Sequence, residues 1–277
     1  MQTAKKNLQK CNFCDHTFSK DKSQCPSCKG WNIAPVEREI VNDGVTSLMD
    51  TTGEDDSNQE FIQTGPWDPC FGRNLHDDGT FEYGIPKGAV ALLGGKNGAG
   101  KSTLVMQTCE SVIAATKREV VIVSVEEAKK QVRRLAKRLK LEHADQIMIS
   151  KGDVELDIIL HKRKPAMVVV DSLPRLCPNL DDAVEFCKRL KAHVELLNIP
   201  AIVINHINKE EEFAGLEALQ HEVDATLIFT IYPDEVRQLR SLKNRNGPLA
   251  EVLFNMTDTG LVERSPEEDA EEEDDDE

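Results

Sequence analysis

Gly95-Lys96-Asn97-Gly98-Ala99-Gly100-Lys101-Ser102 matches the phosphate-binding loop G-x-x-x-x-G-K-[ST]. It stands between an apolar run at 89–94 and a helical pattern at 102–115, the strand-loop-helix setting that this loop requires. Its glycines let backbone N–H groups wrap phosphates at a helix N-terminus. We therefore expect the loop and Thr103 to bind nucleotide, with Lys101 on the β- and γ-phosphates and Ser102 on Mg²⁺. The alternative is a glycine-rich turn without a ligand.

Apolar runs alternate with helical patterns on the C-terminal side of this loop. The runs cover 120–125, 146–149, 167–170 and 201–205, and the helical patterns cover 128–139, 183–197 and 216–221. Runs without period-two alternation are typical of strands buried on both faces of a parallel sheet. After Asp224, three more runs follow with only turns between them, at 225–231, 236–243 and 250–256. We expect an α/β fold whose mostly parallel sheet is closed by an antiparallel extension, with Asn246-Gly247 in a tight hairpin.

Three of the predicted strands are followed by residues suited to phosphate chemistry. Asp171 follows the run at 167–170 and is a candidate ligand of Mg²⁺, directly or through its water, or else it caps the next turn. Glu126 lies at the end of the run at 120–125 and is the candidate general base, or else an acid of the following helix's first turn. His206 follows the run at 201–205 and either senses the γ-phosphate or is a structural histidine.

Two cations, Lys243 and Arg245, lie near the predicted hairpin, far in sequence from the phosphate-binding loop. They are either solvated or act as fingers that reach the γ-phosphate of a neighbouring subunit. The second interpretation requires an oligomer.

Four of the eight cysteines form two C-x-x-C pairs, Cys11 with Cys14 and Cys25 with Cys28. This spacing is typical of a tetrahedral Cys₄ zinc site, and zinc binding would fold so small a segment. The alternative is a redox C-x-x-C pair, which needs a thioredoxin-like setting that the sequence lacks. The other four cysteines are scattered, and we expect them to be small core residues.

Composition separates the ends of the chain from its body. The 277 residues carry a net charge of −15, and ten of the last eleven positions are acidic. We expect a zinc-finger module at 1–34, a linker at 35–63, an α/β domain with the phosphate-binding loop at 64–265 and a disordered acidic tail at 266–277. No apolar run is long enough for a membrane span and no export signal precedes the module. We therefore expect the protein to be cytoplasmic.

The motifs occur in the order found in one family. They are Gly30-Trp31-Asn32 after the cysteines, the phosphate-binding loop, Ser124-Val125-Glu126-Glu127, Asp171-Ser172, His206-Ile207-Asn208-Lys209, the segment 215–224 and Lys243-Asn244-Arg245-Asn246-Gly247. Over residues 8–264 the chain resembles the RadA/Sms family of RecA-fold recombination ATPases. The resemblance implies a DNA-dependent ATPase of a bacterial or phage-infected cell. It further implies that the protein forms hexameric rings on single-stranded DNA and drives branch migration in homologous recombination. It also implies roles for Lys101, Ser102, Glu126, Asp171, His206, Lys243 and Arg245 in nucleotide chemistry.

Some features depart from the family pattern. Asn246 stands where the family has Phe, which is closer to the finger segment of DnaB-type helicases. The chain ends soon after Arg264, so we expect a compact, phage-like form without the Lon-like C-terminal domain. The acidic tail resembles those with which single-stranded DNA-binding proteins recruit recombination or replication partners.

DNA contact is expected from the loops after Asp171 and His206, with Arg175 and Lys209 as the nearest cations. The leading hypothesis is a motor that couples ATP hydrolysis to translocation on single-stranded DNA, helicase-like or in branch migration. The rival is a recombination mediator or annealing protein that uses ATP as an assembly switch, and a third class is a KaiC-like signalling ATPase.

Overall fold

The computed structural model describes residues 8–11, 16–19, 22, 24–29, 33–35, 59–124, 129–150, 156–206, 214–232 and 235–264. Contacts divide the chain into two units, Met1–Asp56 and Ser57–Glu277. The predicted acidic tail and most of the predicted linker lie outside the described residues, and the predicted domain boundaries stay predictions. Among the described residues, no helix is both long and apolar enough to cross a membrane.

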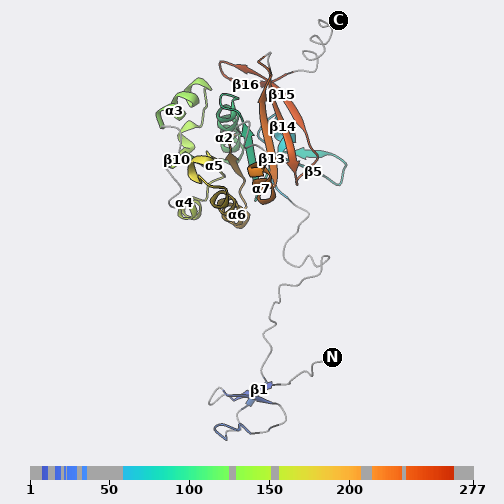
Figure 1. The fold of residues 1–277 in the computed structure, drawn as a ribbon. Coiled ribbons are helices and arrows are strands. Elements are labelled where there is room, and N and C mark those ends of the chain that lie inside the picture. The colour runs from blue at the N-terminus through green and yellow to red at the C-terminus, as the bar shows by residue number, and fades with distance from the viewer. Residues whose placement is uncertain are drawn as a thin grey trace. The chain divides into compact units, whose positions relative to one another are not determined.

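A nine-stranded sheet forms the centre of the second unit (Figure 1). From edge to edge its strands are β10 (Ile147–Ser150), β9 (Val120–Ser124), β11 (Met167–Asp171), β12 (Ala201–Ile204), β8 (Val90–Gly95), β13 (Ala225–Ile231), β14 (Arg237–Asn244), β15 (Glu251–Thr257) and β16 (Gly260–Glu263). The pairs from β10 to β13 are parallel and those from β13 to β16 are antiparallel. The expected α/β fold with an antiparallel extension is confirmed.

Helices cover both faces of the parallel part of the sheet. One face packs against α2 (Lys101–Thr116) and α3 (Lys129–Arg138). The other packs against α4 (Leu156–Arg163), α5 (Leu173–Leu176), α6 (Leu180–Leu197) and α7 (Ala214–Glu222). In β8, Ala91 and Leu93 enter the first core whereas Val90 and Leu92 enter the second. Both faces are apolar for this reason, which explains the uninterrupted apolar runs.

Short elements before β8 pack beside the antiparallel strands. They are β4 (Phe61–Ile62), α1 (Asp68–Phe71), β5 (Arg73–Leu75), β6 (Phe81–Tyr83) and β7 (Ile85–Pro86). A single 3₁₀ turn, η1 (Ala144–Gln146), precedes β10. Trp67 and Phe71 are buried with Phe254 of β15 in the first core.

The hairpin between β14 and β15 exists, but the expectation of a tight turn at Asn246-Gly247 is wrong. Residues 245–250 separate the two strands. The Asn246 carbonyl accepts a hydrogen bond of 2.9 Å from the Arg73 N–H, so this loop is held against β5. The two-residue turn lies instead at Asp258-Thr259, between the paired residues Thr257 and Gly260.

The N-terminal unit contains a small antiparallel sheet in the order β2-β1-β3. Its strands are β1 (Leu8–Cys11), β2 (Thr17–Ser19) and β3 (Ile33–Pro35). Cys11, Phe18 and Cys25 are its buried cluster among the described residues.

Candidate active site and metal centre

The phosphate-binding loop joins the central strand β8 to helix α2, as its motif predicts. Gly95 has φ 150°, and a Cβ there would stand 2.4 Å from the Phe229 carbonyl oxygen of β13. Gly100 has φ 108° and precedes the first residue of α2. Both conformations favour glycine because a side chain would clash or force strained backbone. The glycines therefore let the loop turn tightly from strand into helix.

Lys101 lies inside the loop and is only 5% exposed. Its Nζ donates hydrogen bonds to the carbonyl oxygens of Gly95, at 2.6 Å, and of Lys96, at 3.0 Å. Lys96, Asn97 and Gly98 are exposed, whereas Ala99 is buried. The ammonium group is thus held where backbone N–H groups and a helix N-terminus also favour anions. Phosphate oxygens can take the place of the two carbonyls as its acceptors.

Strand register brings Asp171 toward the strand ends that carry the phosphate-binding loop. Asp171 pairs with Ser124, while Val170 pairs with Val203. Ile204 in turn pairs with Leu93, so half-buried Asp171 is level with Leu93, two residues before the end of β8. Two strand spacings, about 10 Å, separate Asp171 from β8. That gap is compatible with an Mg²⁺ ligand acting through water, which is the role predicted for Asp171.

His206 follows β12, the strand next to β8, and is half-buried. The preceding N–H, of Asn205, donates a hydrogen bond of 2.9 Å to the Leu93 carbonyl and keeps the chain beside β8. Arg175 is exposed on α5, which follows β11 at the same edge. Glu126 and Lys209 lie outside the described residues. Their roles, like those of the other site residues, stay predictions.

The structure separates Lys243 and Arg245 from the phosphate-binding loop of the same chain. The Arg245 N–H bonds to the Asp224 carbonyl, and the Asp224 N–H bonds to the Val90 carbonyl at the start of β8. The phosphate-binding loop follows the C-terminal end of β8. The two cations therefore lie toward the N-terminal ends of the parallel strands, on the opposite side of the sheet from the loop. Arg245 Nη1 is 3.6 Å from Asp224 Oδ1, and Arg245 Nη2 donates to the His221 carbonyl at 3.3 Å.

Lys243 is held beside the end of α7. Its Nζ donates to the carbonyl oxygens of Gln220 and Val223, the second at 2.7 Å. Burial, together with the positive charge of Arg245, lowers the pKa of the Lys243 amine. Within one chain, neither cation contacts the phosphate-binding loop.

Sequence reasoning missed Arg138 as a residue of this site. Its Nη2 donates to Thr103 Oγ1 at 3.2 Å, next to Ser102 in the first turn of α2. Its Nη1 lies 3.4 Å and 3.3 Å from the carbonyl oxygens of Thr257 and Asp258 in the β15–β16 turn. The guanidinium thus ties α3 and the antiparallel strands to the loop helix. Arg138 is one of seven cations between residues 129 and 140, and nothing in the local sequence distinguishes it from the others.

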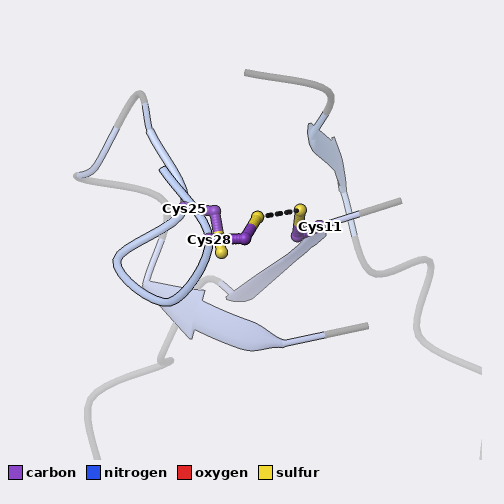
Figure 2. Close-up of side chains that lie close together, drawn as sticks. All are labelled: Cys11, Cys25 and Cys28. Carbon is purple, nitrogen blue, oxygen red and sulfur yellow. Dashed lines mark hydrogen bonds between the residues drawn. The ribbon is translucent and has the colours of Figure 1, made fainter. Parts of the chain in front are cut away.

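The N-terminal unit places three of the four predicted zinc ligands together (Figure 2). Cys11 comes from β1, and Cys25 and Cys28 come from one turn. Their sulfurs lie within 4.8 Å of one another, and those of Cys11 and Cys28 are 3.5 Å apart. Tetrahedral zinc with Zn–S bonds of about 2.3 Å sets sulfurs about 3.8 Å apart, so these thiols fit the ion. Cys14 lies outside the described residues.

Comparisons with known proteins agree with this geometry. Residues 76–147 match the family described as "ATPase: KaiC". The chain is 31% identical to the DNA repair protein RadA of Chlamydia pneumoniae, a match that covers 96% of this chain and 60% of that protein. It is 29% identical to the DNA repair protein RadA of Bacillus subtilis, with 91% and 58% covered.

A solved KaiC-like protein from Pyrococcus horikoshii has the same fold, with a TM-score of 0.61 at 17% identity. The match covers 75% of this chain and 100% of that one. The fold and the loop therefore define a P-loop ATPase domain of the RecA and KaiC type. Within that class the chain is similar to the RadA proteins over more than 90% of its length, which agrees with the resemblance to the RadA/Sms family that its motifs indicate. It spans about 60% of the length of the curated relatives that it matches.

Proposed function

We propose that this protein binds and hydrolyses ATP and uses it to move on single-stranded DNA in repair and recombination. The observation that carries the proposal is the loop of residues 95–102, whose buried Lys101 donates hydrogen bonds to the carbonyls of Gly95 and Lys96. Asp171 ends one of two neighbouring parallel strands and His206 follows the other, at the same end of the sheet. The RadA proteins that the chain resembles are named as DNA repair proteins, which supports the process.

Each residue of the loop edge has a role in this proposal. Lys101 binds the β- and γ-phosphates, while residues 95–103 supply backbone and side-chain contacts. Ser102 and Asp171 would hold Mg²⁺, which neutralises charge on those phosphates when bound. Glu126 takes the proton of the attacking water, and His206 hydrogen-bonds the γ-phosphate. Arg175 and Lys209 contact the DNA backbone.

Lys243 and Arg245 complete the proposed site from a neighbouring copy. They lie near the N-terminal ends of the parallel strands, whereas their own phosphate-binding loop follows the C-terminal end of β8. They can therefore serve as fingers only between subunits. The active form would then be an oligomer, and the proposed state is a hexameric ring. Cys11, Cys14, Cys25 and Cys28 would hold one structural zinc ion.

The test is ATP hydrolysis with and without single-stranded DNA, alongside Lys101→Ala and Glu126→Gln. We expect DNA to stimulate turnover, Lys101→Ala to abolish nucleotide binding, and Glu126→Gln to keep binding but lose hydrolysis. Strand separation or branch migration that requires hydrolysis would support the motor. Unaltered nucleotide affinity in Lys101→Ala would show that the loop is misassigned.

One observation favours the rival function, an ATP-switched mediator or annealing protein. Arg245 is engaged by Asp224 and His221 in this chain, so hydrolysis would wait for assembly. Mixing two inactive variants, Lys101→Ala and Arg245→Ala, tests whether hydrolysis needs a finger from a neighbouring copy. Partial recovery of DNA-stimulated hydrolysis is expected if fingers act between subunits, since mixed interfaces pair an intact loop with an intact finger. DNA annealing that persists in Glu126→Gln would instead support the mediator.

A further inference from the structure

Helix α3 and the residues just after it concentrate positive charge on one surface. Six side chains, which we call the α3 patch, are exposed there: Lys129, Lys130, Arg133, Arg134, Lys137 and Lys140. Residues 129–141 contain no acidic side chain. Val132, Ala136 and Leu139 are buried and anchor the helix on the core, which leaves the cations outward.

None of the six cations forms an ion pair or a side-chain hydrogen bond with any residue that the structure describes. Like charges recur three and four positions apart along the helix, as in Lys129, Arg133 and Lys137. Such pairs repel one another and destabilise a helix. A polyanion laid on this surface would relieve that repulsion.

The surroundings of the patch show where such a ligand can lie. Lys129, Arg133, Lys137 and Lys140 border an open groove of about 880 Å³ between α3 and the edge strand β10. Arg163 also borders the groove but is paired with Glu119 at 3.0 Å. Glu142 and Asp145 border it too, so the ligand would follow the α3 cations rather than fill the groove.

We propose that the α3 patch is a DNA-binding surface that contacts the sugar-phosphate backbone, separate from Arg175 and Lys209. This inference rests on the proposed function in that it takes DNA as the ligand. Residues 129–141 contain no aromatic side chain on which bases could stack. Binding is therefore electrostatic and independent of base sequence.

Arg138 connects this surface to the nucleotide site. It projects from α3 to Thr103, next to the residue predicted to hold Mg²⁺. A DNA strand that shifts α3 would move the first turn of α2 through this hydrogen bond. The patch thus offers a physical route by which DNA changes the rate of ATP hydrolysis.

The test is the triple variant Arg133→Gln, Arg134→Gln and Lys137→Gln in the full chain, measured with a fluorescent oligo-dT strand over a range of salt. Gln is a good helix former, and the change removes like-charge pairs, so the fold is retained. We expect the slope of log K against log salt to fall by about two, and affinity to drop about a hundredfold at about 0.1 M salt. Basal hydrolysis without DNA stays, while its stimulation by DNA falls.

The matched control replaces three exposed lysines away from α3, Lys117, Lys162 and Lys164, by Gln. It carries the same charge change and should keep the original salt slope. An unchanged slope in the α3 variant, with DNA still bound by the unaltered chain, overturns this inference alone. Absence of any DNA binding by the unaltered chain overturns the DNA part of the proposed function.

One further outcome would reassign the patch. A synthetic peptide of residues 265–277 carries the acidic tail and can be titrated against the same variants. If the α3 variant loses this peptide but keeps its DNA affinity, the patch serves an acidic protein segment and the inference is overturned.

Discussion

At the scale of single residues, two glycines of the phosphate-binding loop should differ sharply when a methyl group is added. In Gly95→Ala the new Cβ would stand 2.4 Å from the Phe229 carbonyl, whereas Gly98→Ala has nothing within 4 Å. Both have positive φ, so Gly98→Ala should cost about 1 kcal/mol of strain alone. Gly95→Ala adds a backbone clash and should cost about 2–4 kcal/mol. Urea unfolding without nucleotide measures both, and equal losses would contradict the close approach of β8 and β13.

Residues whose contacts are local could be predicted, and residues defined by tertiary contacts could not. The phosphate-binding loop around Lys101 could be predicted because one contiguous segment supplies both its glycines and its lysine. Asp171 was identified because an apolar strand ends at it. Asp224 holds Lys191 and Arg245 and accepts the Val90 N–H at 2.9 Å, but those partners are distant in sequence. Arg138 likewise acquires its place only when α3 packs beside α2.

At the scale of elements, Gln107 holds the edge strand β16 on helix α2. Its Oε1 accepts the Leu261 N–H at 2.9 Å, and its Nε2 donates to the Leu261 carbonyl at 3.2 Å. Gln107→Ala leaves both backbone groups without this partner and should lower stability by about 1–3 kcal/mol. Gln107→Glu keeps the acceptor, so its loss should be smaller. The measurement is hydrogen exchange at the Leu261 N–H. Its rate should rise from the unaltered chain to Gln107→Glu and again to Gln107→Ala. Equal rates in the three proteins would show that Gln107 does not hold β16 on α2.

Elements with strong apolar runs could be predicted, while short or mixed ones could not. The parallel strands were found because burial on both faces leaves no polar alternation. Helix α4 was missed because its apolar residues are adjacent rather than spaced along one face, and Ile158 is 44% exposed. Strand β16 was missed because it has four residues and begins at a glycine. The turn at 245–250 was misjudged because its contact with Arg73 is long-range.

At the scale of the whole molecule, the chain combines two means of stabilisation. The second unit has two extensive apolar cores, whereas the described part of the N-terminal unit has one small cluster that includes two cysteines. The proposed zinc ion would add a constraint to this small cluster of described residues. This division was predictable from cysteine spacing and apolar runs. The separation of the finger cations from the loop was not, because it follows from strand order.

The same division should appear in the reactivity of the cysteines. Burial raises the pKa of the Cys70 and Cys187 thiols to about 12, and also raises that of Cys109. At pH 8, below those values, the three stay protonated and inert to iodoacetamide while the second unit is folded. A zinc chelator should release about one ion per chain and expose Cys11, Cys14, Cys25 and Cys28 to alkylation.

Mass spectrometry of the alkylated peptides, with and without chelator, measures this pattern. Guanidinium provides the control, because unfolding should make all eight cysteines reactive. Cys11→Ser should already lack the ion, since three thiolates bind zinc less tightly than four. Alkylation of Cys109 after chelation alone would mean that the two units unfold together, because that thiol is buried in the core that packs α2 against the sheet.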